Sequence, residues 1–261
     1  MTDENDPPVD PATVLMQQAS GYALHEGMNR YGMTRVLLGV MVAVHVAVGA
    51  VPFVRGNATW LQIFVGARGP RLLTRFGAQA GDQIQDGEVW RLISTMFLHG
   101  DALHMLLNGV AFLALGRLCE AVYGSVRFLW LFLVAGVCGS ALSFLGGNAL
   151  SVGASGGIFG LLGAAVVFGW RYRHKLPPGA SDFFRMRLLP WVALNLFIGA
   201  VIPFIDNLGH TGGLIGGAVM AALIGNRVVP GEEGTARGKV WMASVSFAIL
   251  AWAALGVGRQ W

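Results

Sequence analysis

Two glycine-rich stretches decide how this chain folds: GASGGIFGLLG at residues 153–163 and DNLGHTGGLIGG at residues 206–217. In both, glycines recur at intervals that place them along one side of a helix. The stripes consist of Gly156, Gly157, Gly160 and Gly163 in the first stretch, and Gly212, Gly213, Gly216 and Gly217 in the second. Because glycine has no side chain, such stripes allow two helix backbones to approach closely. We therefore expect helices formed by these two stretches to pack against each other.

The composition around these stretches is that of a membrane protein. Of the 261 residues, 54% are hydrophobic and only 12% are charged, with a mean hydropathy of +0.59, whereas soluble domains carry about 25% charged residues. The 38 glycines show no third-residue period, which excludes collagen, and the apolar content excludes a disordered chain. Lipid cannot satisfy open backbone groups, so we expect an all-α, polytopic transmembrane helical bundle.

Seven apolar segments are near the length of about 20 residues that a helix needs to cross a bilayer. They cover residues 34–54, 101–119, 127–146, 154–171, 188–205, 208–226 and 240–257. These segments divide the chain into an acidic, flexible or amphipathic tail (1–33), a six-helix core (34–226) and a linker with an extra C-terminal helix (227–261). The long connection at 55–98 mixes aromatic and basic residues, so we expect it to lie at the membrane interface.

The distribution of Lys and Arg predicts the orientation of these helices. With the N-terminus in the cytoplasm, the cytoplasmic side holds Arg30, Arg35, Arg117, Arg127, Arg171, Arg173, Lys175, Arg185, Arg187, Arg227, Arg237 and Lys239. The opposite side holds Arg55, Arg68, Arg71, Arg75, Arg91 and Arg259. Basic residues favour cytoplasmic connections. This pattern predicts a cytoplasmic N-terminus and an extracytoplasmic C-terminus. We place the multi-pass protein in a bacterial inner (plasma) membrane, an expectation that does not follow from the charge pattern.

Neither the net charge nor the cysteines point to nucleic acid or metal. The net charge of +4 comes without any basic run interleaved with aromatic residues, so we expect no nucleic-acid partner. Cys119 and Cys138 form no CxxC pattern, and we interpret both as small packing residues rather than as a disulfide or zinc site.

Polar residues inside apolar helices are costly, so each one needs an explanation. His104 and Asn108 are four apart in the segment 101–119, Ser155 opens the segment 154–171, and His210 lies in the first turn of the segment 208–226. All three segments run from the extracytoplasmic to the cytoplasmic side. The four residues are therefore predicted to lie in one layer near the extracytoplasmic surface.

This layer has the chemistry of a serine hydrolase. A serine hydroxyl becomes a nucleophile when a neighbouring imidazole accepts its proton, which Ser155 and His210 would allow. Asn108, His104 and the Ser155 backbone N–H could stabilise an oxyanion. Each residue also has a structural interpretation: packing for the serine, an interfacial position for the histidine, and interhelical bonding for the asparagine. We interpret Asp206 as a helix cap rather than a third member of a triad.

Several separated motifs together resemble the rhomboid family of intramembrane serine proteases. They are the pair Trp90-Arg91, the pattern His99-x4-His104-x3-Asn108, the run Gly116-x3-Glu120-x3-Gly124, the nucleophile motif Gly153-x-Ser155-Gly156, and the histidine motif His210-x-Gly212-Gly213. The resemblance covers about residues 34–226, and a seventh helix is similar to the family's six-plus-one form.

The resemblance implies a Ser155–His210 dyad without a catalytic aspartate. It implies an oxyanion site formed by Asn108, His104 and the Ser155 amide. Phe159 stands where the family more often has a tyrosine, and its ring would stack beside the histidine. The implied substrates are single-span membrane proteins with small, helix-breaking residues near the cut, and no metal or cofactor is implied.

The resemblance also assigns supporting roles. Trp90 and Arg91 would anchor the 55–98 connection at the membrane interface, and Glu120 would be structural. If water reaches the dyad, we expect a polar cavity open to the extracytoplasmic face. His99, Ser151 and Asn148 would lie near its rim, covered by the connections at 147–153 and about 205–209.

Other functions fit the sequence less well. An inactive rhomboid-like binding protein would be expected to lack the serine or the histidine, and both are present. A transporter or channel would spread polar groups through the whole membrane depth, often with carboxylates inside the helices. The chain has no HExxH motif of a metalloprotease, and it lacks the two intramembrane aspartates of an aspartyl protease.

Overall fold

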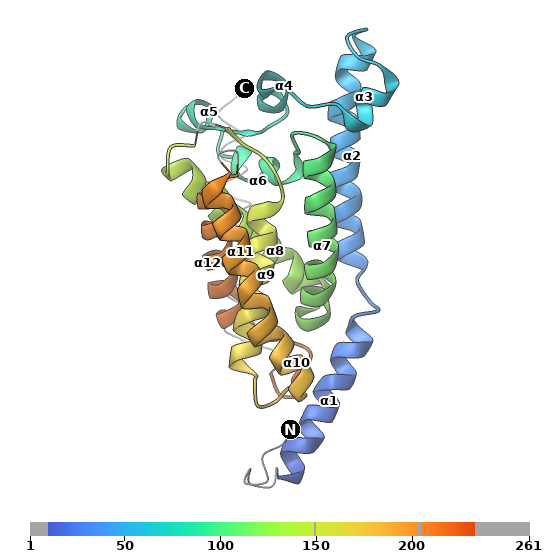
Figure 1. The fold of residues 1–261 in the computed structure, drawn as a ribbon, viewed down its shortest axis with the longest axis vertical. Coiled ribbons are helices and arrows are strands. Elements are labelled where there is room, and N and C mark those ends of the chain that lie inside the picture. The colour runs from blue at the N-terminus through green and yellow to red at the C-terminus, as the bar shows by residue number, and fades with distance from the viewer. Residues whose placement is uncertain (1–9, 149, 203–204, 233–261) are drawn as a thin grey trace.

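The computed structural model describes residues 10–148, 150–202 and 205–232, and in these residues the chain is a bundle of helices with one small sheet (Figure 1). In chain order the elements are α1 (Pro11–Gly27), α2 (Gly32–Val54), α3 (Trp60–Val65), α4 (Pro70–Arg75), β1 (Gln79–Ala80), α5 (Gly81–Gln85), α6 (Arg91–Ser94), the 3-10 turn η1 (Thr95–Phe97), α7 (Ala102–Tyr123), α8 (Ser125–Leu145), β2 (Leu150–Ser151), α9 (Ser155–Arg171), α10 (Pro178–Asp182), the π-helical turn η2 (Phe183–Arg187), α11 (Leu188–Val201) and α12 (Asn207–Leu223). The predicted all-α architecture is confirmed. The segment 240–257, predicted as a seventh helix, lies outside the described residues.

The helices differ in length more than the sequence predicted. The helical stretch that ends at Val54, together with α7 and α8, is long and apolar enough to cross a membrane, whereas α9 and α11 are shorter apolar helices. The helices α9 and α12 have 17 residues each, close to the predicted segments 154–171 and 208–226, whereas α11 has 14 residues and is shorter than the predicted segment 188–205. A span of 17 residues is about 26 Å long. The backbone just beyond the ends of such a short helix is not helical. At membrane depth, non-helical backbone is tolerated where protein surrounds it, and α9 lies in the middle of the bundle (Figure 1).

The glycine stripes of α9 and α12 face each other, as predicted. A Cβ atom built on Gly213 would overlap the carbonyl oxygen of Gly156, and one built on Gly217 would overlap the carbonyl oxygen of Gly160. Helix α8 joins the same contact, which the sequence did not predict: a Cβ atom on Gly139 would lie 2.6 Å from the carbonyl oxygen of Gly209. The backbones of three helices therefore meet without intervening side chains.

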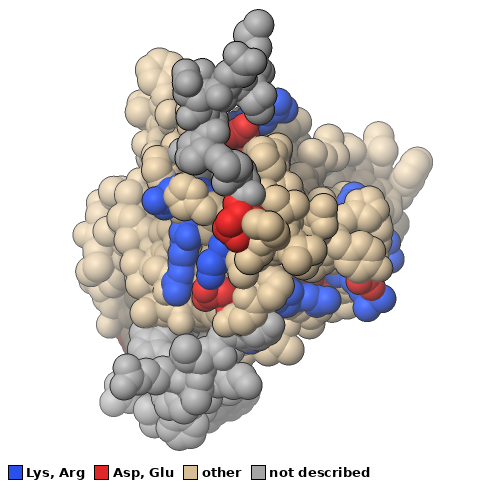
Figure 2. All heavy atoms as spheres, turned by 90° about the horizontal axis from the view of Figure 1, so that it is seen from below, with Lys and Arg blue, Asp and Glu red and all other residues tan. Residues whose placement is uncertain are grey.

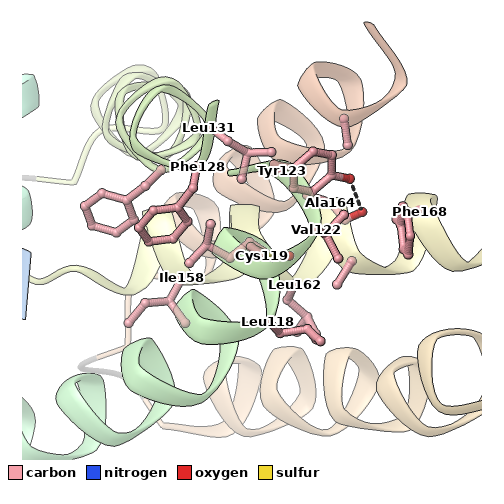
Figure 3. Packing of buried hydrophobic residues seen from close by; sticks show 14 of the residues in the cluster. Leu118, Cys119, Val122, Tyr123, Phe128, Leu131, Ile158, Leu162, Ala164 and Phe168 are labelled. Atoms are coloured by element: carbon pink, nitrogen blue, oxygen red, sulfur yellow. Dashed lines mark hydrogen bonds between the residues drawn. The ribbon is translucent and has the colours of Figure 1, made fainter. Parts of the chain in front are cut away.

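A hydrophobic core lies between α7, α8 and α9 and includes Met220 and Ala221 of α12. Figure 3 shows its members pointing toward one another from the three helices, with the Tyr123 hydroxyl directed at Ala164. The hydroxyl of Tyr123 donates to the carbonyl oxygen of Ala164 at 3.1 Å. The phenol thus fills the core while its polar atom has a partner, which keeps burial of the ring favourable.

Both ends of the described chain pack on this core. The segment predicted as a tail contains α1, whose N-cap residue Asp10 accepts hydrogen bonds from two backbone N–H groups. At the other end of α1, a Cβ atom built on Gly27 would lie 3.0 Å from the methyl group of Ala121 on α7. After α12 the chain folds back, and Val228 and Val229 are buried in the core. The boundaries at residues 33 and 226 stay predictions, and within the described part of the chain residues beyond each of them contact the core.

The two ends of the bundle carry different connections. In Figure 1, α1 and α10 lie at one end, while α3, α4 and α5 from the 55–98 connection lie at the other. Figure 2 looks at the end that carries α1 and shows Lys and Arg beside a few acidic residues. Arg30, Arg171, Arg173 and Arg227 are exposed, and all belong to connections predicted to be cytoplasmic. Which end faces the cytoplasm stays a prediction.

Candidate active site

Ser155 is the first residue of α9, at the end of a tightly held turn. Gly153, two residues earlier, has a φ of +124°, a backbone conformation that favours glycine. The N–H of Gly153 donates to the carbonyl oxygen of Thr95 at 3.0 Å, and the Thr95 hydroxyl donates to the carbonyl oxygen of Ser151 at 2.5 Å. The backbone that leads to Ser155 is thus bonded to η1 on both sides of the turn.

The small sheet holds the same turn from a second direction. Strand β2 pairs with β1 in antiparallel register, with Gln79 opposite Ser151 and Ala80 opposite Leu150. This pairing links the 55–98 connection to the connection that precedes Ser155. The sequence did not predict this sheet, because two strands of two residues carry no detectable periodicity.

His210 lies in the first turn of α12 and is 9% exposed. The aromatic ring of Phe159 stacks on its imidazole, with ring centroids 4.1 Å apart and planes at 11°, as the resemblance implied for this position. Phe159 is one helical turn after Ser155, so this stack fixes the imidazole against the start of α9. The Nδ1 atom of His210 is buried and lacks a hydrogen-bond partner in the part of the chain that the structure describes.

The start of α9 and the start of α12 meet at backbone contact. The contact between Gly156 and Gly213 lies one residue after Ser155 and three after His210. A small cavity of about 20 Å³, with room for one water molecule, is lined by Ser155, Asp206 and Gly209 among others. Within the described residues, no hydrogen bond joins the Ser155 hydroxyl to the His210 imidazole. The structure therefore brings the two helix starts together and leaves that bond unmade.

The two candidate oxyanion residues lie on α7 beside the same turn. A Cβ atom built on Gly153 would lie 2.7 Å from Nε2 of His104, so the imidazole lies against the backbone that leads to Ser155. One turn later, Nδ2 of Asn108 donates to the carbonyl oxygen of His104 at 3.0 Å. Asn108 is 8% exposed, and its Oδ1 is buried without a partner among the residues described. One amide hydrogen of Asn108 is left for another acceptor.

His99 lies away from the expected cavity rim. Its ring is 2% exposed and contacts the rings of His104 and His45 edge-on, with centroids 5.1 and 6.5 Å away. Burial, with smaller contributions from the two neighbouring histidines, lowers the pKa of His99 to about 3. The expectation that it borders the cavity was wrong, because its imidazole packs as a neutral ring behind His104. Of the other expected rim residues, Ser151 lines the cavity.

Trp90 and Arg91 organise the 55–98 connection. The Trp90 ring lies on Gly77, whose φ of +97° and close ring contact leave no room for a side chain. The Arg91 guanidinium is bonded to the Glu88 carboxylate, with Nε 2.6 Å from Oε2, and donates to the carbonyl oxygen of Thr74 at 2.5 Å. The pair thus ties the turn before β1, at Thr74 and Gly77, to the segment 88–91 that follows α5. The predicted anchoring at a membrane interface stays a prediction.

Sequence reasoning missed part of the site. Thr95 holds the turn before Ser155, yet nothing in its surroundings marked it as special. Asp206 is the N-cap predicted for α12, accepting from the backbone N–H of Gly209 at 2.8 Å. The sequence did not indicate the further partners of Asp206, which come from Ser143, Asn148 and Ser151.

Comparison with known proteins points to one family. A family model described as the Rhomboid domain matches residues 86–227, more than half of the chain. Rhomboid protease GluP of Bacillus subtilis is 38% identical over 165 residues, which are 63% of this chain and 32% of that protein. RHOMBOID-like protein 7 of Arabidopsis thaliana is 38% identical over 158 residues, 58% of this chain and 48% of that protein.

A third relative comes from a parasite. Rhomboid-like protease 5 of Toxoplasma gondii is 35% identical over 166 residues, 62% of this chain and 20% of that protein. In each of these three cases the matched region is less than half of the relative's length. The matched segment contains every residue of the candidate site, from Trp90 to His210. On the matched domain, the chain belongs to the rhomboid family.

Proposed function

We propose that this protein is an intramembrane serine endopeptidase that cleaves transmembrane substrates with a Ser155–His210 dyad. The observation that carries the proposal is the backbone contact between the first turns of α9 and α12, where these two residues stand. The stacked ring of Phe159 supports it, because it holds the imidazole at the start of α9. The names of two relatives, Rhomboid protease GluP and Rhomboid-like protease 5, include protease activity.

In this proposal the Ser155 hydroxyl attacks a peptide carbonyl while His210 accepts its proton. A serine hydroxyl is a weak nucleophile, and a neutral imidazole within hydrogen-bond reach activates it. Catalytic hydrogen bonds are often long in a free enzyme and tighten in the substrate complex. We expect the Ser155–His210 bond to form when a substrate segment enters beside α9. His210 then gives the proton to the leaving amine as the peptide C–N bond breaks, which leaves an acyl ester on Ser155. Water attacks this ester while His210 accepts its proton, and the proton returns to the Ser155 oxygen as the carboxylic acid product leaves.

The oxyanion would be held by donors from two helices. The backbone N–H of Ser155 points from a helix start, where the helix dipole favours negative charge. The second amide hydrogen of Asn108 and the imidazole of His104 are the side-chain donors that we propose. His104 lies against Gly153, and Asn108 lies one turn further along α7. Both side-chain donors would therefore approach the scissile carbonyl from the same helix.

The membrane setting follows from the family and the helices. The apolar helices and the rhomboid domain make the chain an integral multi-pass membrane protein. We propose that its substrates are single-span membrane proteins. We further propose a bacterial inner membrane with the N-terminus in the cytoplasm, supported by the excess of Lys and Arg in the connections at the α1 end of the bundle.

The test is cleavage of a fluorescent single-span substrate by purified protein in proteoliposomes. The wild-type protein should cleave it, while Ser155→Ala and His210→Ala should fall to the level of liposomes without protein. Two matched controls lie on other elements: Ser20→Ala on α1 and His174→Ala after α9 should both keep wild-type rates. A fluorophosphonate probe should label Ser155, as read by peptide mass spectrometry.

Two results would overturn the proposal. Cleavage that persists in Ser155→Ala would show that another group is the nucleophile. A folded wild-type protein that neither cleaves a panel of single-span substrates nor reacts with the probe would indicate a binding protein with the same fold.

A further inference from the structure

Asp206 makes more bonds than a helix cap requires. Its Oδ1 atom accepts from the backbone N–H of Gly209 at 2.8 Å, the cap bond, and also from Nδ2 of Asn148 at 2.7 Å. Its Oδ2 atom accepts from the hydroxyls of Ser143 and Ser151, the latter at 2.7 Å. Both oxygens of the side chain are therefore engaged, and two of the three side-chain donors are serines.

These donors come from three separate parts of the fold. Ser143 belongs to α8, Asn148 and Ser151 belong to the connection that contains β2, and the cap bond lies within α12. Ser151 precedes Ser155 by four residues, just as Asp206 precedes His210 by four. The Asp206–Ser151 bond is thus a direct link between the segment that leads to the nucleophile and the segment that leads to the base.

The carboxylate also borders the cavity beside Ser155. Asp206, Ser151 and Ser155 are all among the residues that line it. A shift of the start of α12 away from β2 would therefore open this cavity and separate the two helix starts. Further along the helices, the backbone contact between Gly156 and Gly213 limits sliding of α9 and α12 past each other. The position of the first turn of α12 depends instead on the bonds to Asp206.

A carboxylate suits this position better than the other good capping residues. Asparagine caps helices about as well as aspartate. However, the four groups around Asp206 are all donors in this structure, and a carboxylate only accepts. An asparagine would place an NH₂ group either toward the Gly209 N–H, which cannot accept, and toward Asn148, whose amide would have to flip, or toward the two serine hydroxyls, which would have to turn away.

We propose that Asp206 is a positioning residue that ties β2 to the start of α12 and so holds Ser155 and His210 in register. This inference rests on the proposed protease function, because the register matters for catalysis only if the two residues react together. Asp206 takes no part in the bond-making steps, and it acts through Ser151 and through the cap of α12.

The test compares Asp206→Asn with wild type in the proteoliposome assay. The asparagine keeps the cap but disturbs the link to β2, so kcat should fall on the order of 10- to 100-fold, as misplacement of reacting groups does. The KM should stay within about twofold of wild type, since no substrate contact changes. The matched control is Asp10→Asn at the N-cap of α1, which accepts from Ala12 and Thr13 and should keep the wild-type kcat.

A double variant separates the link from a general loss of stability. If Ser151 and Asp206 act through one bond, Asp206→Asn combined with Ser151→Ala should be no slower than Asp206→Asn alone, because coupled residues are not additive. Independent, multiplying losses would contradict the proposal. So would a wild-type kcat in Asp206→Asn, which would reduce Asp206 to a cap.

Hydrogen–deuterium exchange tests the tie without any need for activity. In Asp206→Asn, exchange should rise in peptides that cover 150–154 and 205–212, while Asp10→Asn leaves both unchanged. Unchanged exchange in both peptides would overturn the proposal, even if the enzyme is slowed. If the wild-type protein proves inactive but these peptides loosen, the tie between β2 and α12 stands and the protease function fails. If the wild type cleaves and Asp206→Asn behaves identically in cleavage and exchange, the protease function stands and the tie between β2 and α12 fails.

Discussion

At the scale of single residues, Asn108 offers a clear test of the oxyanion site. One amide hydrogen is used by the carbonyl oxygen of His104, and the other is available for a developing negative charge. Asn108→Ala should lower kcat on the order of 10²- to 10³-fold, the usual cost of removing one oxyanion donor. The KM should change little, because the donor binds the transition state rather than the substrate.

The control for this prediction lies on α11. Nδ2 of Asn195 donates to the carbonyl oxygen of Trp191 at 2.8 Å, the same bond to a carbonyl four residues earlier. Asn195→Ala therefore removes a matching helical asparagine away from Ser155, and kcat should stay within about twofold of wild type. Equal losses in the two variants would mean that Asn108 acts through helix stability alone.

At the scale of elements, the packing of α12 on α9 depends on Gly213. A methyl group there would meet the backbone of Gly156, which cannot turn aside as a side chain would. Gly213→Ala should lower the melting temperature by several degrees and abolish cleavage, since it separates the two helix starts. Thermal unfolding in detergent, followed by circular dichroism, measures the first effect.

Gly39→Ala is the matched control for Gly213. Gly39 lies within α2, and a Cβ atom built there meets nothing within 4 Å. Because alanine favours a helix over glycine by about 1 kcal/mol, this variant should be as stable as the wild type or slightly more stable. A melting temperature that falls equally in both variants would show that the α9–α12 contact is not the cause.

Glu120 joins three helices through one buried carboxylate. It is 1% exposed and accepts from the backbone N–H groups of Met33 and Thr34 at 2.9 and 2.8 Å, from the Thr34 hydroxyl, and from the Ser125 hydroxyl at 2.7 Å. It thereby holds the first turns of α2 and α8 to the end of α7, which agrees with the structural role that the motif implied.

Glu120→Gln should therefore be strongly destabilising. Hydrogen bonds to a charged group are worth about 1.5–3 kcal/mol each, and the amide of glutamine cannot replace all the acceptor sites. We expect a melting temperature lowered by several degrees, measured in the same detergent. Glu26→Gln is the control, because the Glu26–Arg30 pair is exposed at 46% and 69% and such pairs contribute little. Equal stability of Glu120→Gln and wild type would contradict this role.

The end of the described chain supplies a prediction about pH. Lys175 donates to the Glu232 carboxylate at 2.7 Å, and this hydrogen bond is the main cause that lowers the pKa of Glu232 below its ordinary value of 4.5. A lowered carboxyl pKa stabilises the fold above the unfolded pKa, and the effect is lost as the pH falls through the folded value. The pair is partly exposed, so its contribution should be at most about 1 kcal/mol.

The measurement compares Glu232→Gln with wild type at two pH values. At pH 7 the variant should unfold at a slightly lower temperature, and at pH 3.5 the difference should shrink. A difference that is constant with pH would show that the bond from the Tyr172 hydroxyl (3.2 Å), or the shape of the side chain, matters more than the charge.

At the scale of the whole molecule, the opposite placement of α1 and α3 makes the orientation testable. Arg173 and Arg71 are both exposed, one in the connection after α9 and one in α4. In a chain whose Cys119 and Cys138 are replaced by alanine, a membrane-impermeant maleimide should label Arg71→Cys in right-side-out vesicles. It should label Arg173→Cys only in inverted vesicles. The opposite labelling pattern would reverse the proposed topology.

The sequence could predict what depends on residues close together in the chain. Hydropathy located the helices of the described core, because about 20 apolar residues in succession have no other stable place than lipid or a core. Spacing of four along α7 placed His104 and Asn108 on one face. The glycine stripes predicted the contact between α9 and α12, because only glycine allows backbones so close.

The tertiary structure decided what depends on residues far apart. Strand β1 meets β2 across about 70 residues of chain, Thr95 meets Ser151 across 56, and Asp206 meets Ser143 across 63. No periodicity records such pairs, since each is a single bond made by a side chain or a short strand. The sequence by itself therefore determined the membrane bundle and pointed to the candidate reactive residues. Only the folded chain decided how the turn before Ser155 and the first turn of α12 are held together, because those bonds exist only after the helices have packed.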